Sequence, residues 1–441
     1  MAPEKITASS FLARWRERAL APVDIAPLVW FRVAFGVILL VEVGRYFAYG
    51  WIERYFIAPE FMFKYYGFGW VQPWPGGLMN LHFFALGILA ACVALGVRYR
   101  LAAALFFIGF TYVFLLDQAR YLNHFYLVCL YAGLLAVIPA HRAFSWDAWQ
   151  RPALRSGTAP AWTLWLLRAQ ICAVYFFGGI AKLNSDWLHG EPMRMWLARR
   201  SDYPVVGEWF THESAAYFFS YAGVMFDLGI VPLVWWRRTR WFAIGAAALF
   251  NLVNAWIFQI GIFPWLAFGA TLLLFVPNLP KPWPALWRSS NPAVAPPAPH
   301  PRWLAFAAIY VAAQILVPLR HWFYPGDVLW TEEGHRFSWR MKLRSKDAIL
   351  ALKAHDPDSQ QTWDVVLPNY INGIQYDEAA GRPDMILQLA HHVADDFRHQ
   401  GFAHIQVRAQ ALVSLNGRAD ELLIDPNVDL AAEPRTLGHV A

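Results

Sequence analysis

Charged residues are scarce in this sequence. Asp, Glu, Lys and Arg together make up 15% of its 441 residues, whereas an ordinary soluble domain has about 25%. Hydrophobic residues reach 58% and are segregated along the chain. Long apolar runs fill residues 1–322, and residues 323–441 have the composition of a globular domain. The scarcity of charge therefore excludes a wholly soluble protein and predicts a membrane-embedded domain followed by a soluble one.

Cysteine is rare as well. The three cysteines, Cys92, Cys129 and Cys172, all lie in apolar runs, and the predicted soluble domain has none. This distribution argues against a disulfide-stapled fold and leaves the redox compartment open. A secretory signal peptide is not expected, because three arginines within residues 14–18 precede the first long apolar run and no small-residue cleavage site follows it.

The sequence also lacks internal repeats, which weakly disfavours the transporter folds built from inverted repeats. The net charge is +6, but the basic residues stand in short clusters between apolar runs. That spacing is typical of membrane proteins that follow the positive-inside rule. We therefore expect a lipid bilayer, and no nucleic acid, as the surroundings of the basic clusters.

Nine apolar runs approach the length of about 20 residues that a helix needs to cross a bilayer. The predicted spans are residues 28–43, 80–97, 101–116, 124–139, 163–181, 215–235, 242–258, 260–276 and 303–319. Because Gly261 and Pro264 interrupt the seventh and eighth runs, the count is nine give or take one. Residues 280–301 are rich in Pro and Ala and predict an irregular linker.

The orientation follows from the basic residues between the spans. If the N-terminus is cytoplasmic, the connecting segments on that side hold roughly twice as many Lys and Arg residues as the others. Nine spans then place the soluble domain outside, which for a bacterial inner membrane is the periplasm. A count wrong by one would reverse that side.

The soluble domain is predicted to be small, β-rich and of α+β type. Strand-like runs occupy residues 336–343, 362–367 and 403–415, and Asn416-Gly417 is a strong turn signal. Residues 384–400 have apolar side chains at helical spacing after Pro383, which predicts one clear helix. The expected architecture is thus an α-helical polytopic membrane domain of about nine spans with a small extracytoplasmic domain.

Two polar clusters lie at the predicted outer face and are candidates for chemistry, because polar groups are costly in a membrane. One lies between the third and fourth spans and contains Asp117, Gln118, Asn123 and His124; the other follows the fifth span and contains Lys182, Asn184, Asp186 and His189. In the predicted topology both clusters face the soluble domain. Together they would form one shared site.

Lys182 is the most informative single residue, since it directly follows an apolar and aromatic run. Burial disfavours the charged form of an amine, so a buried lysine can serve as a general base near neutral pH. The alternative is a lysine that extends its side chain to the interface and has no catalytic role. Position alone leaves both interpretations open.

The remaining polar residues have structural interpretations beside functional ones. His124 could orient a substrate or cap its helix, and no metal site is expected, because no second His or carboxylate follows at helical spacing. His391 and His392 with Asp395 fit a solvated helix face. Several polar residues near span ends are expected to form interhelical bonds or to line a head-group pocket: Arg32, Glu42, Arg168, Asp227, Asn251 and Asn254.

Five motifs, in chain order, resemble the vitamin K-dependent γ-glutamyl carboxylases, whose membrane part is of the HTTM type. They are LNHFYL at residues 122–127, YFFGGIAKLNSDWLHG at 175–190, WT with FSWRM at 330–331 and 337–341, VSLNGR at 413–418, and IDPNVD at 424–429. The matches span about two-thirds of the chain. The lysine-containing motif and the soluble-domain motifs are specific, whereas the Asn-His motif alone is weak.

The resemblance implies an enzyme that couples oxygenation of reduced vitamin K, of the phylloquinone or menaquinone type, to carboxylation of glutamate in a peptide or protein substrate. Oxygen and carbon dioxide are co-substrates, the quinone leaves as its epoxide, and no metal takes part. By resemblance Lys182 deprotonates the hydroquinone, and His124 and Asn123 orient or stabilise reacting groups. The implied cofactor-binding residues are Tyr175, Phe176 and Trp187, and the implied substrate-binding residues are Trp330, His335, Trp339, Arg344 and Arg418.

The sequence departs from the animal enzymes of that family. They have two consecutive lysines where this chain has Ala181-Lys182, and a Tyr and a His where it has His335 and Arg344. The animal disulfide between the two domains cannot form, since the soluble domain has no cysteine. These departures affect recognition of the protein substrate more than quinone chemistry. Two alternatives therefore stand beside the carboxylase: a quinol epoxidase that modifies no glutamate, and a non-enzymatic peptide-export or immunity membrane protein.

Overall fold

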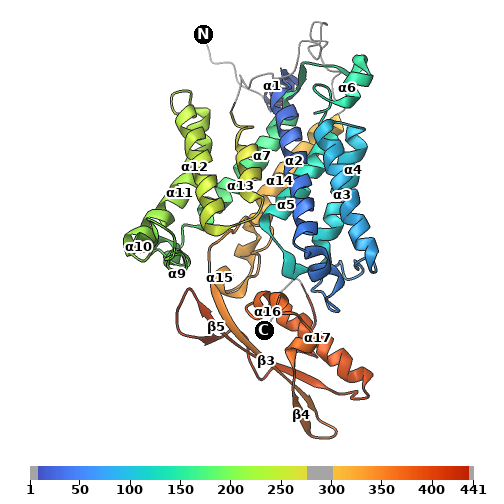
Figure 1. Ribbon diagram of the computed structural model, residues 1–441, viewed down its shortest axis with the longest axis vertical. Coiled ribbons are helices and arrows are strands. Elements are labelled where there is room, and N and C mark those ends of the chain that lie inside the picture. The colour runs from blue at the N-terminus through green and yellow to red at the C-terminus, as the bar shows by residue number, and fades with distance from the viewer. Residues whose placement is uncertain (1–7, 276–300, 437–441) are drawn as a thin grey trace.

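Long apolar helices build the larger part of the molecule, and the C-terminal domain packs against one end of them (Figure 1). The computed structural model describes residues 8–275 and 301–436. Within these residues seven helices are long and apolar enough to cross a membrane. They are α2 (Ala26–Ala48), α3 (Gly77–Leu95), α4 (Tyr99–Leu116), α7 (Ala161–Ala181), α11 (Glu213–Trp235), α12 (Arg240–Phe258) and α14 (Pro301–Leu319).

Two shorter helices take the places of the other predicted spans. The helix α5 (Asn123–Val137) has 15 residues and α13 (Phe263–Thr271) has nine. The predicted count of nine give or take one is roughly consistent with these helices. The last residue of the eighth predicted span, residue 276, and residues 280–300 of the predicted linker lie outside the described residues.

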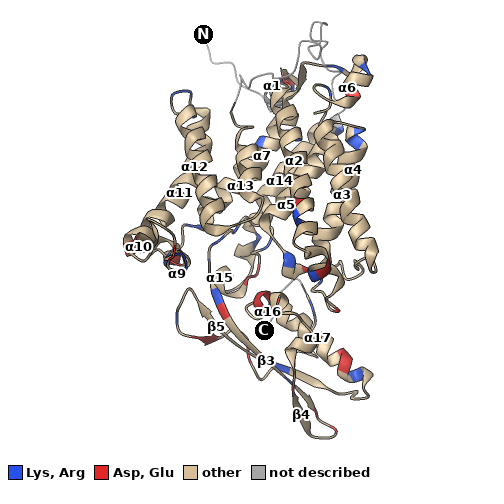
Figure 2. Cartoon of the chain, viewed as in Figure 1, with Lys and Arg blue, Asp and Glu red and all other residues tan. Residues whose placement is uncertain are grey.

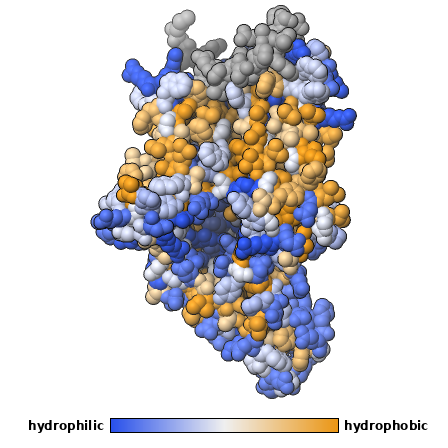
Figure 3. Space-filling view, in the orientation of Figure 1, coloured by the Kyte–Doolittle hydropathy of each residue, from blue (hydrophilic) through white to orange (hydrophobic). Residues whose placement is uncertain are grey.

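The surface of the bundle is apolar where lipid would surround it. Large side chains such as Leu81, Ile108 and Met225 are 60%, 62% and 72% exposed. Figure 3 shows a hydrophobic band across the face of the bundle in view, and Figure 2 shows that charged residues are sparse along the bundle and gather toward its two ends. An apolar surface of this extent is stable in a bilayer and not in water. The protein is an integral membrane protein.

Short elements connect the spans at the two ends of the bundle. They are α1 (Ala8–Leu20), α6 (Trp146–Gln150), α8 (Ser185–Leu188), α9 (Met193–Ala198), α10 (Gly207–Phe210), and the paired strands β1 (Pro22–Asp24) and β2 (Thr158–Pro160). The N-terminal helix α1 and the C-terminal domain lie at opposite ends of the bundle (Figure 1).

The C-terminal domain is a four-stranded antiparallel sheet in the order β4-β3-β5-β6 with helices beside it. Its elements are α15 (Val328–Thr331), β3 (Lys346–Asp356), β4 (Gln361–Asp364), α16 (Gly373–Ala379), α17 (Pro383–His399), β5 (Gln406–Leu415) and β6 (Glu421–Leu422). In β5 buried and more exposed side chains alternate, because successive residues of a strand face opposite sides of the sheet. The buried face packs against α17 in one hydrophobic core.

Several predicted elements of this domain are confirmed. The helix predicted at residues 384–400 is α17, and Pro383 lies in its first turn, where a missing N–H costs nothing. The strand predicted at residues 403–415 is β5. Asn416 and Gly417 both have positive φ, 55° and 77°, as the predicted tight turn requires.

Two strand predictions need correction. Residues 336–343 form no strand, because Phe337, Trp339 and Lys342 adopt positive φ angles of 65°, 58° and 49°, which no β ladder accommodates. The strand predicted at residues 362–367 is the shorter β4, and a 3₁₀ turn follows it at Leu367–Asn369. The aromatic side chains that gave residues 336–343 a strand-like composition instead pack against the membrane helices.

A buried polar network fastens the C-terminal domain to the bundle. The carboxylate of Asp117, just after α4, accepts hydrogen bonds from the Ala119 N–H and from the Gln375 amide at 2.9 and 3.2 Å. Gln388 of α17 donates to the Gln118 side chain at 3.1 Å and accepts from the Lys64 N–H at 2.8 Å. These bonds join loops at one end of the bundle to α16 and α17.

The substitution Gln388→Ala should loosen this joint. It leaves the Lys64 N–H and the Gln118 amide oxygen without partners in a buried interface, which costs about 1–3 kcal/mol. Hydrogen exchange should speed up at residues 61–64 and 117–120. The matched control is Gln410→Ala on the exposed face of β5; equal exchange in both variants would show that the network does not hold the domains together.

Candidate functional site

Lys182 stands at the junction of α7 and α8, where the chain leaves the bundle. It is the C-cap residue of α7, and its backbone N–H bonds to the Gly179 carbonyl. Asn184 fixes the next turn: its side-chain oxygen accepts from the Trp187 N–H at 3.0 Å, and its amide donates to the Ala181 carbonyl at 2.9 Å. One Asn thus caps both helices, so the backbone holds Lys182 firmly.

The side chain of Lys182 turns into the protein and forms an ion pair with Asp227 of α11. The two side chains are 10% and 7% exposed. Glycines let the two helices approach this closely, since a Cβ on Gly179 would lie 2.5 Å from Leu228 Cδ2. A Cβ on Gly178 would lie 3.3 Å from the Asp227 carboxylate. Small residues allow the same close packing of helices in membranes generally.

Aromatic rings surround this pair unevenly. The Trp187 ring lies 5.5 Å from the Lys182 amine, and its indole N–H donates to the Ser220 carbonyl at 2.8 Å. Tyr175 lies two turns before Lys182 on the same face of α7, and its hydroxyl is 2.6 Å from that of Thr271. Phe176 points away, since its side chain is 54% exposed on the outer face of the bundle. The structure therefore brings Trp187 to the Lys182 amine. Tyr175 bonds to α13 two turns away, and Phe176 faces outward.

Asn123 is linked to the end of α7 by a segment of the C-terminal domain. Asn123 accepts a hydrogen bond from the Tyr121 hydroxyl at 3.0 Å and donates to the Arg340 carbonyl at 3.4 Å. The neighbours of Arg340 complete the link, because Trp339 O and Met341 Cε each lie 3.7 Å from where a Cβ of Gly178 would be. Residues 339–341 thus lie between the two polar clusters that the sequence analysis placed at a shared site.

His124 follows Asn123 on α5 and is, like it, partly buried. Its ring packs against Phe125 at 4.7 Å and against Phe263 of α13 at 6.1 Å between ring centroids. Its Nε2 lies 3.9 Å from where a Cβ of Gly261 would be. The structure thus places the His124 ring at the contact between α5 and α13.

Trp339 is the best-buried large side chain of the segment that touches both clusters. It is 1% exposed and stacks on Tyr126 of α5 with ring centroids 5.0 Å apart. Its backbone is in the left-handed region, and its indole Nε1 has no hydrogen-bond partner within the described residues. Backbone strain and an unpartnered buried donor are both costly, and they concentrate at functional sites.

A buried ion-pair cluster stands behind this segment. Glu332 is 6% exposed and pairs with Arg344, with Lys346 at 3.3 Å and with Arg382 at 3.7 Å. Burial alone raises the pKa of Glu332, but these three cations outweigh it and hold the pKa well below its usual range. Of the residues implied in substrate binding, Arg344 therefore already holds an internal carboxylate.

Two other implied substrate residues lie against the same cluster. The Lys346 amine donates to the Trp330 carbonyl at 2.5 Å, and the Trp330 ring faces that amine at 5.7 Å. Burial and the charge of Arg344 hold the pKa of His335 well below its usual range, so its ring is neutral at neutral pH. Its Nδ1 is buried without a hydrogen-bond partner among the described residues.

Arg418 acts as a clamp between the domains. Its guanidinium forms an ion pair with Asp186 of α8, and Asn416 donates to the same carboxylate at 2.6 Å. The Asn416 side chain also accepts from the Ser345 N–H at 2.8 Å. The turn at Asn416-Gly417 therefore holds α8, which contains Trp187, beside Lys182.

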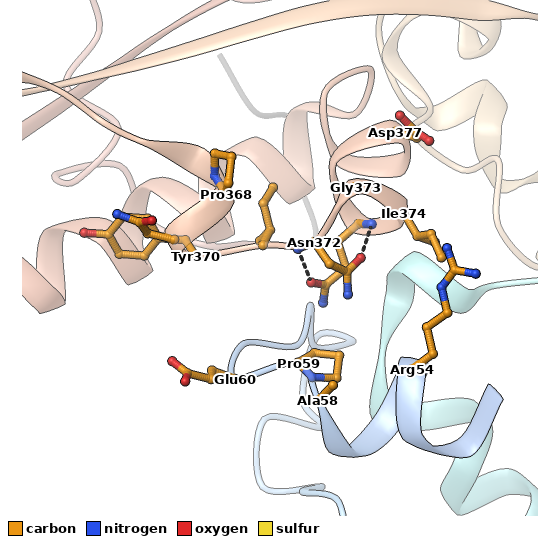
Figure 4. Close-up of a pocket in the computed structure, with 13 residues that line it drawn as sticks. Arg54, Ala58, Pro59, Glu60, Pro368, Tyr370, Asn372, Gly373, Ile374 and Asp377 are labelled. Carbon is orange, nitrogen blue, oxygen red and sulfur yellow. Dashed lines mark hydrogen bonds between the residues drawn. The ribbon is translucent and has the colours of Figure 1, made fainter. Parts of the chain in front are cut away.

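Two cavities open between the bundle and the C-terminal domain, and neither is lined by Lys182. One, of about 640 Å³, lies between Arg54–Glu60 of the α2–α3 loop and the start of α16; Figure 4 shows Arg54, Glu60 and Asp377 around it and the hydrogen bonds of the Asn372 cap. The other, of about 860 Å³, is lined by residues of both domains that include Arg320, Arg336 and Phe337. Figure 3 also shows a hollow at the level where the domains meet.

Comparison with known proteins agrees with this two-part architecture. Residues 20–279 match the family model of the HTTM domain. Residues 300–441 match the family model of the vitamin K-dependent gamma-carboxylase lumenal domain. No solved structure matches the chain.

The fold and the first match define a polytopic membrane protein of the HTTM family. With the second match, the chain belongs to the vitamin K-dependent gamma-carboxylase family. The family implies vitamin K as the cofactor. Among the described residues no group of three His, Cys, Asp or Glu side chains could hold a metal ion.

The sequence predicted the candidate residues but not the residues that contact them. It grouped Asp227 with residues expected to form interhelical bonds and did not connect it to Lys182. It did not single out Glu332. A signal existed for Asp227, because it is the only acidic residue within residues 214–235, and a lone carboxylate in a span is expected to find a cation.

Proposed function

We propose that the protein oxygenates a reduced vitamin K-type quinol and couples this reaction to carboxylation of glutamate side chains in a peptide, with Lys182 as the base. The position of Lys182 supports its role as the base. The amine is buried at the boundary of the two family-matched domains, beside an aromatic residue of the bundle and a strained segment of the C-terminal domain. A protein base of this kind contributes about 10²–10⁴-fold to a rate.

The residues present fit a flat apolar ring that bears oxygen atoms. Trp187 supplies aromatic surface beside the Lys182 amine, Tyr175 lies two turns earlier on the same face of α7, and Trp339 stacks on Tyr126 of α5. The unpartnered Trp339 Nε1 is a buried hydrogen-bond donor among the described residues. When bound, reduced vitamin K would supply the reducing equivalents for oxygen and the basicity that removes a proton from the glutamate γ-carbon. The chain's own part is to hold the ring, accept the hydroxyl proton at Lys182 Nζ and exclude water from the site.

Asn123 and His124 would position the reacting groups in this proposal. The Asn123 amide bridges α5 and the carbonyl of Arg340, so it can fix the distance between the bundle and the segment that includes Trp339. His124 lies among aromatic rings on the α13 side. The proposed peptide substrate approaches from the C-terminal domain, which in the predicted orientation lies outside a bacterial inner membrane with the N-terminus in the cytoplasm.

One observation favours a second candidate, quinol oxygenation without carboxylation. Two of the basic side chains implied in substrate binding already hold internal carboxylates, Arg344 that of Glu332 and Arg418 that of Asp186. A substrate glutamate would have to displace these partners or use other residues.

The test is an assay that separates the two products. Purified protein in lipid nanodiscs is given chemically reduced vitamin K, oxygen, labelled bicarbonate and a glutamate-containing peptide, and epoxide and incorporated label are measured separately. Both products would support the carboxylase, and epoxide without label would support the second candidate. Neither product from folded protein would contradict both and favour a non-enzymatic export or immunity role.

A further inference from the structure

Lys182, the proposed base, is paired with the carboxylate of Asp227. The amine lies in direct contact with the Asp227 carboxylate, and both side chains are buried. The same amine is 3.4 Å from the Gly178 carbonyl, so oxygen atoms face it from α11 and from its own helix. A buried carboxylate beside an amine stabilises the ammonium form. An ammonium has no lone pair and accepts no proton.

Other charged groups near the pair are engaged elsewhere. On α8, Asp186 is held by Arg418 and Asn416. On the C-terminal segment, the Arg340 guanidinium points to His321 at 3.5 Å and the Lys342 amine lies over the Trp196 ring. Among the described residues Tyr175 is a further titratable neighbour of Asp227, and its hydroxyl bonds to Thr271. Asp227 is thus the charged group in direct contact with the Lys182 amine.

We propose that Asp227 is a positioning residue that keeps Lys182 protonated in the resting protein, so that Lys182 becomes a base only when this ion pair opens. The role of Lys182 as a base rests on the proposed function, whereas the contact between Lys182 and Asp227 is present in the structure. When the pair opens, one ammonium proton leaves to water and the amine becomes neutral. The neutral amine can then take the hydroxyl proton of the quinol; the O–H bond breaks, an N–H bond forms, and the electron pair stays on oxygen.

The geometry around the pair makes such opening feasible. The Lys182 side chain is long and follows the last turn of α7. Its amine lies 3.4 Å from the carbonyl of Gly178, and Trp339 and Met341 of the C-terminal domain lie beside that glycine. A shift of that segment alters contacts on Gly178 without unfolding either helix.

The first experiment measures the charge of Lys182 directly and needs no quinol. The full chain in nanodiscs is labelled with acetic anhydride, which acylates only neutral amines, over a series of pH values, and labelling of Lys182 is read by mass spectrometry. In Asp227→Asn the lysine should react at least about tenfold faster at pH 7 than in the unchanged protein, because the stabilising carboxylate is gone. Asp227→Glu, which keeps the charge, should behave like the unchanged protein.

Two lysines serve as internal controls. Lys353 is exposed on β3, and Lys346 is buried in the C-terminal domain. Unchanged labelling of both shows that the variant is folded and that the reagent is equally active. Equal Lys182 labelling in Asp227→Asn and the unchanged protein would overturn the inference.

The second experiment connects the ion pair to turnover. If the unchanged protein oxidises the quinol, Asp227→Asn should shift the acidic limb of its pH–rate profile to lower pH, and Asp227→Glu should restore the original limb. An unshifted profile, or a folded Asp227→Asn that is inactive at every pH, would contradict the inference. If the unchanged protein itself shows no turnover, the proposed function fails, and the labelling experiment still decides the role of Asp227.

Discussion

Replacing Lys182 with alanine is expected to lower quinol oxidation by about 10²–10⁴-fold, the usual contribution of a general base. Lys182→Arg should be nearly as inactive, because a guanidinium stays protonated and cannot accept a proton. Lys182→Arg should fold, since Arg keeps the positive charge next to Asp227. Lys182→Ala leaves the buried Asp227 carboxylate without its cation, so its folding is checked by thermal unfolding before the assay. Epoxide formation under single-turnover conditions is the measurement, because it reports chemistry apart from product release.

The control for this prediction is Lys353→Ala, the same change at an exposed position of β3 whose ion pair with Asp364, at 3.7 Å, lies on the surface. It should leave turnover unchanged. Full activity in Lys182→Arg would mean that the lysine only extends toward the interface, as the non-catalytic interpretation of its position holds.

The second large effect is expected at Glu332, on stability. Glu332→Gln removes the carboxylate that Arg344, Lys346 and Arg382 share in a buried cluster. Arg382 keeps its ion pair with Glu378, so the loss falls on Arg344 and Lys346. Breaking a buried ion pair by removing one partner costs about 3–5 kcal/mol, because the remaining charges stay buried without compensation. Thermal unfolding in detergent should show a clearly lower midpoint for the C-terminal domain.

The pH dependence of this loss has a definite sign. The pKa of Glu332 is held well below its usual range by the three cations, against the opposing effect of burial. The stabilisation is therefore present at every pH above about 4.5, the value for the unfolded chain, and is lost only as the pH falls through the lowered pKa of the folded state. The difference between Glu332→Gln and the unchanged protein should accordingly stay constant from pH 5 to 6, below the range in which Lys346, whose pKa burial lowers to about 8, loses its proton.

Glu421→Gln is the matched control, because Glu421 is exposed in the edge strand β6. It should change stability by less than about 0.5 kcal/mol. A Glu332→Gln variant as stable as this control would show that the buried cluster is not needed for the fold.

Hydrophobic periodicity was sufficient to find most of the architecture. Seven predicted spans correspond to long apolar helices, because a bilayer-crossing helix must bury about 20 apolar residues wherever its neighbours lie. The helix α17 and the strand β5 were found for the same local reason, since their patterns repeat with the periods of a helix and a strand. The strand predicted at residues 336–343 was wrong because the aromatic residues there pack across a domain boundary, and periodicity contains no information on long-range contacts.

The candidate site could likewise be predicted only in part from the sequence. The sequence by itself determined that Lys182 follows an apolar run, that Asn123 stands just before a span and that Trp339 stands in a motif of the soluble domain. Only the tertiary structure decided which groups face them: Asp227 from 45 residues away for Lys182 and the Arg340 carbonyl from 217 away for Asn123. The physical reason is that the charge state of a buried group depends on neighbours within a few ångströms, and folding supplies those neighbours from distant parts of the chain.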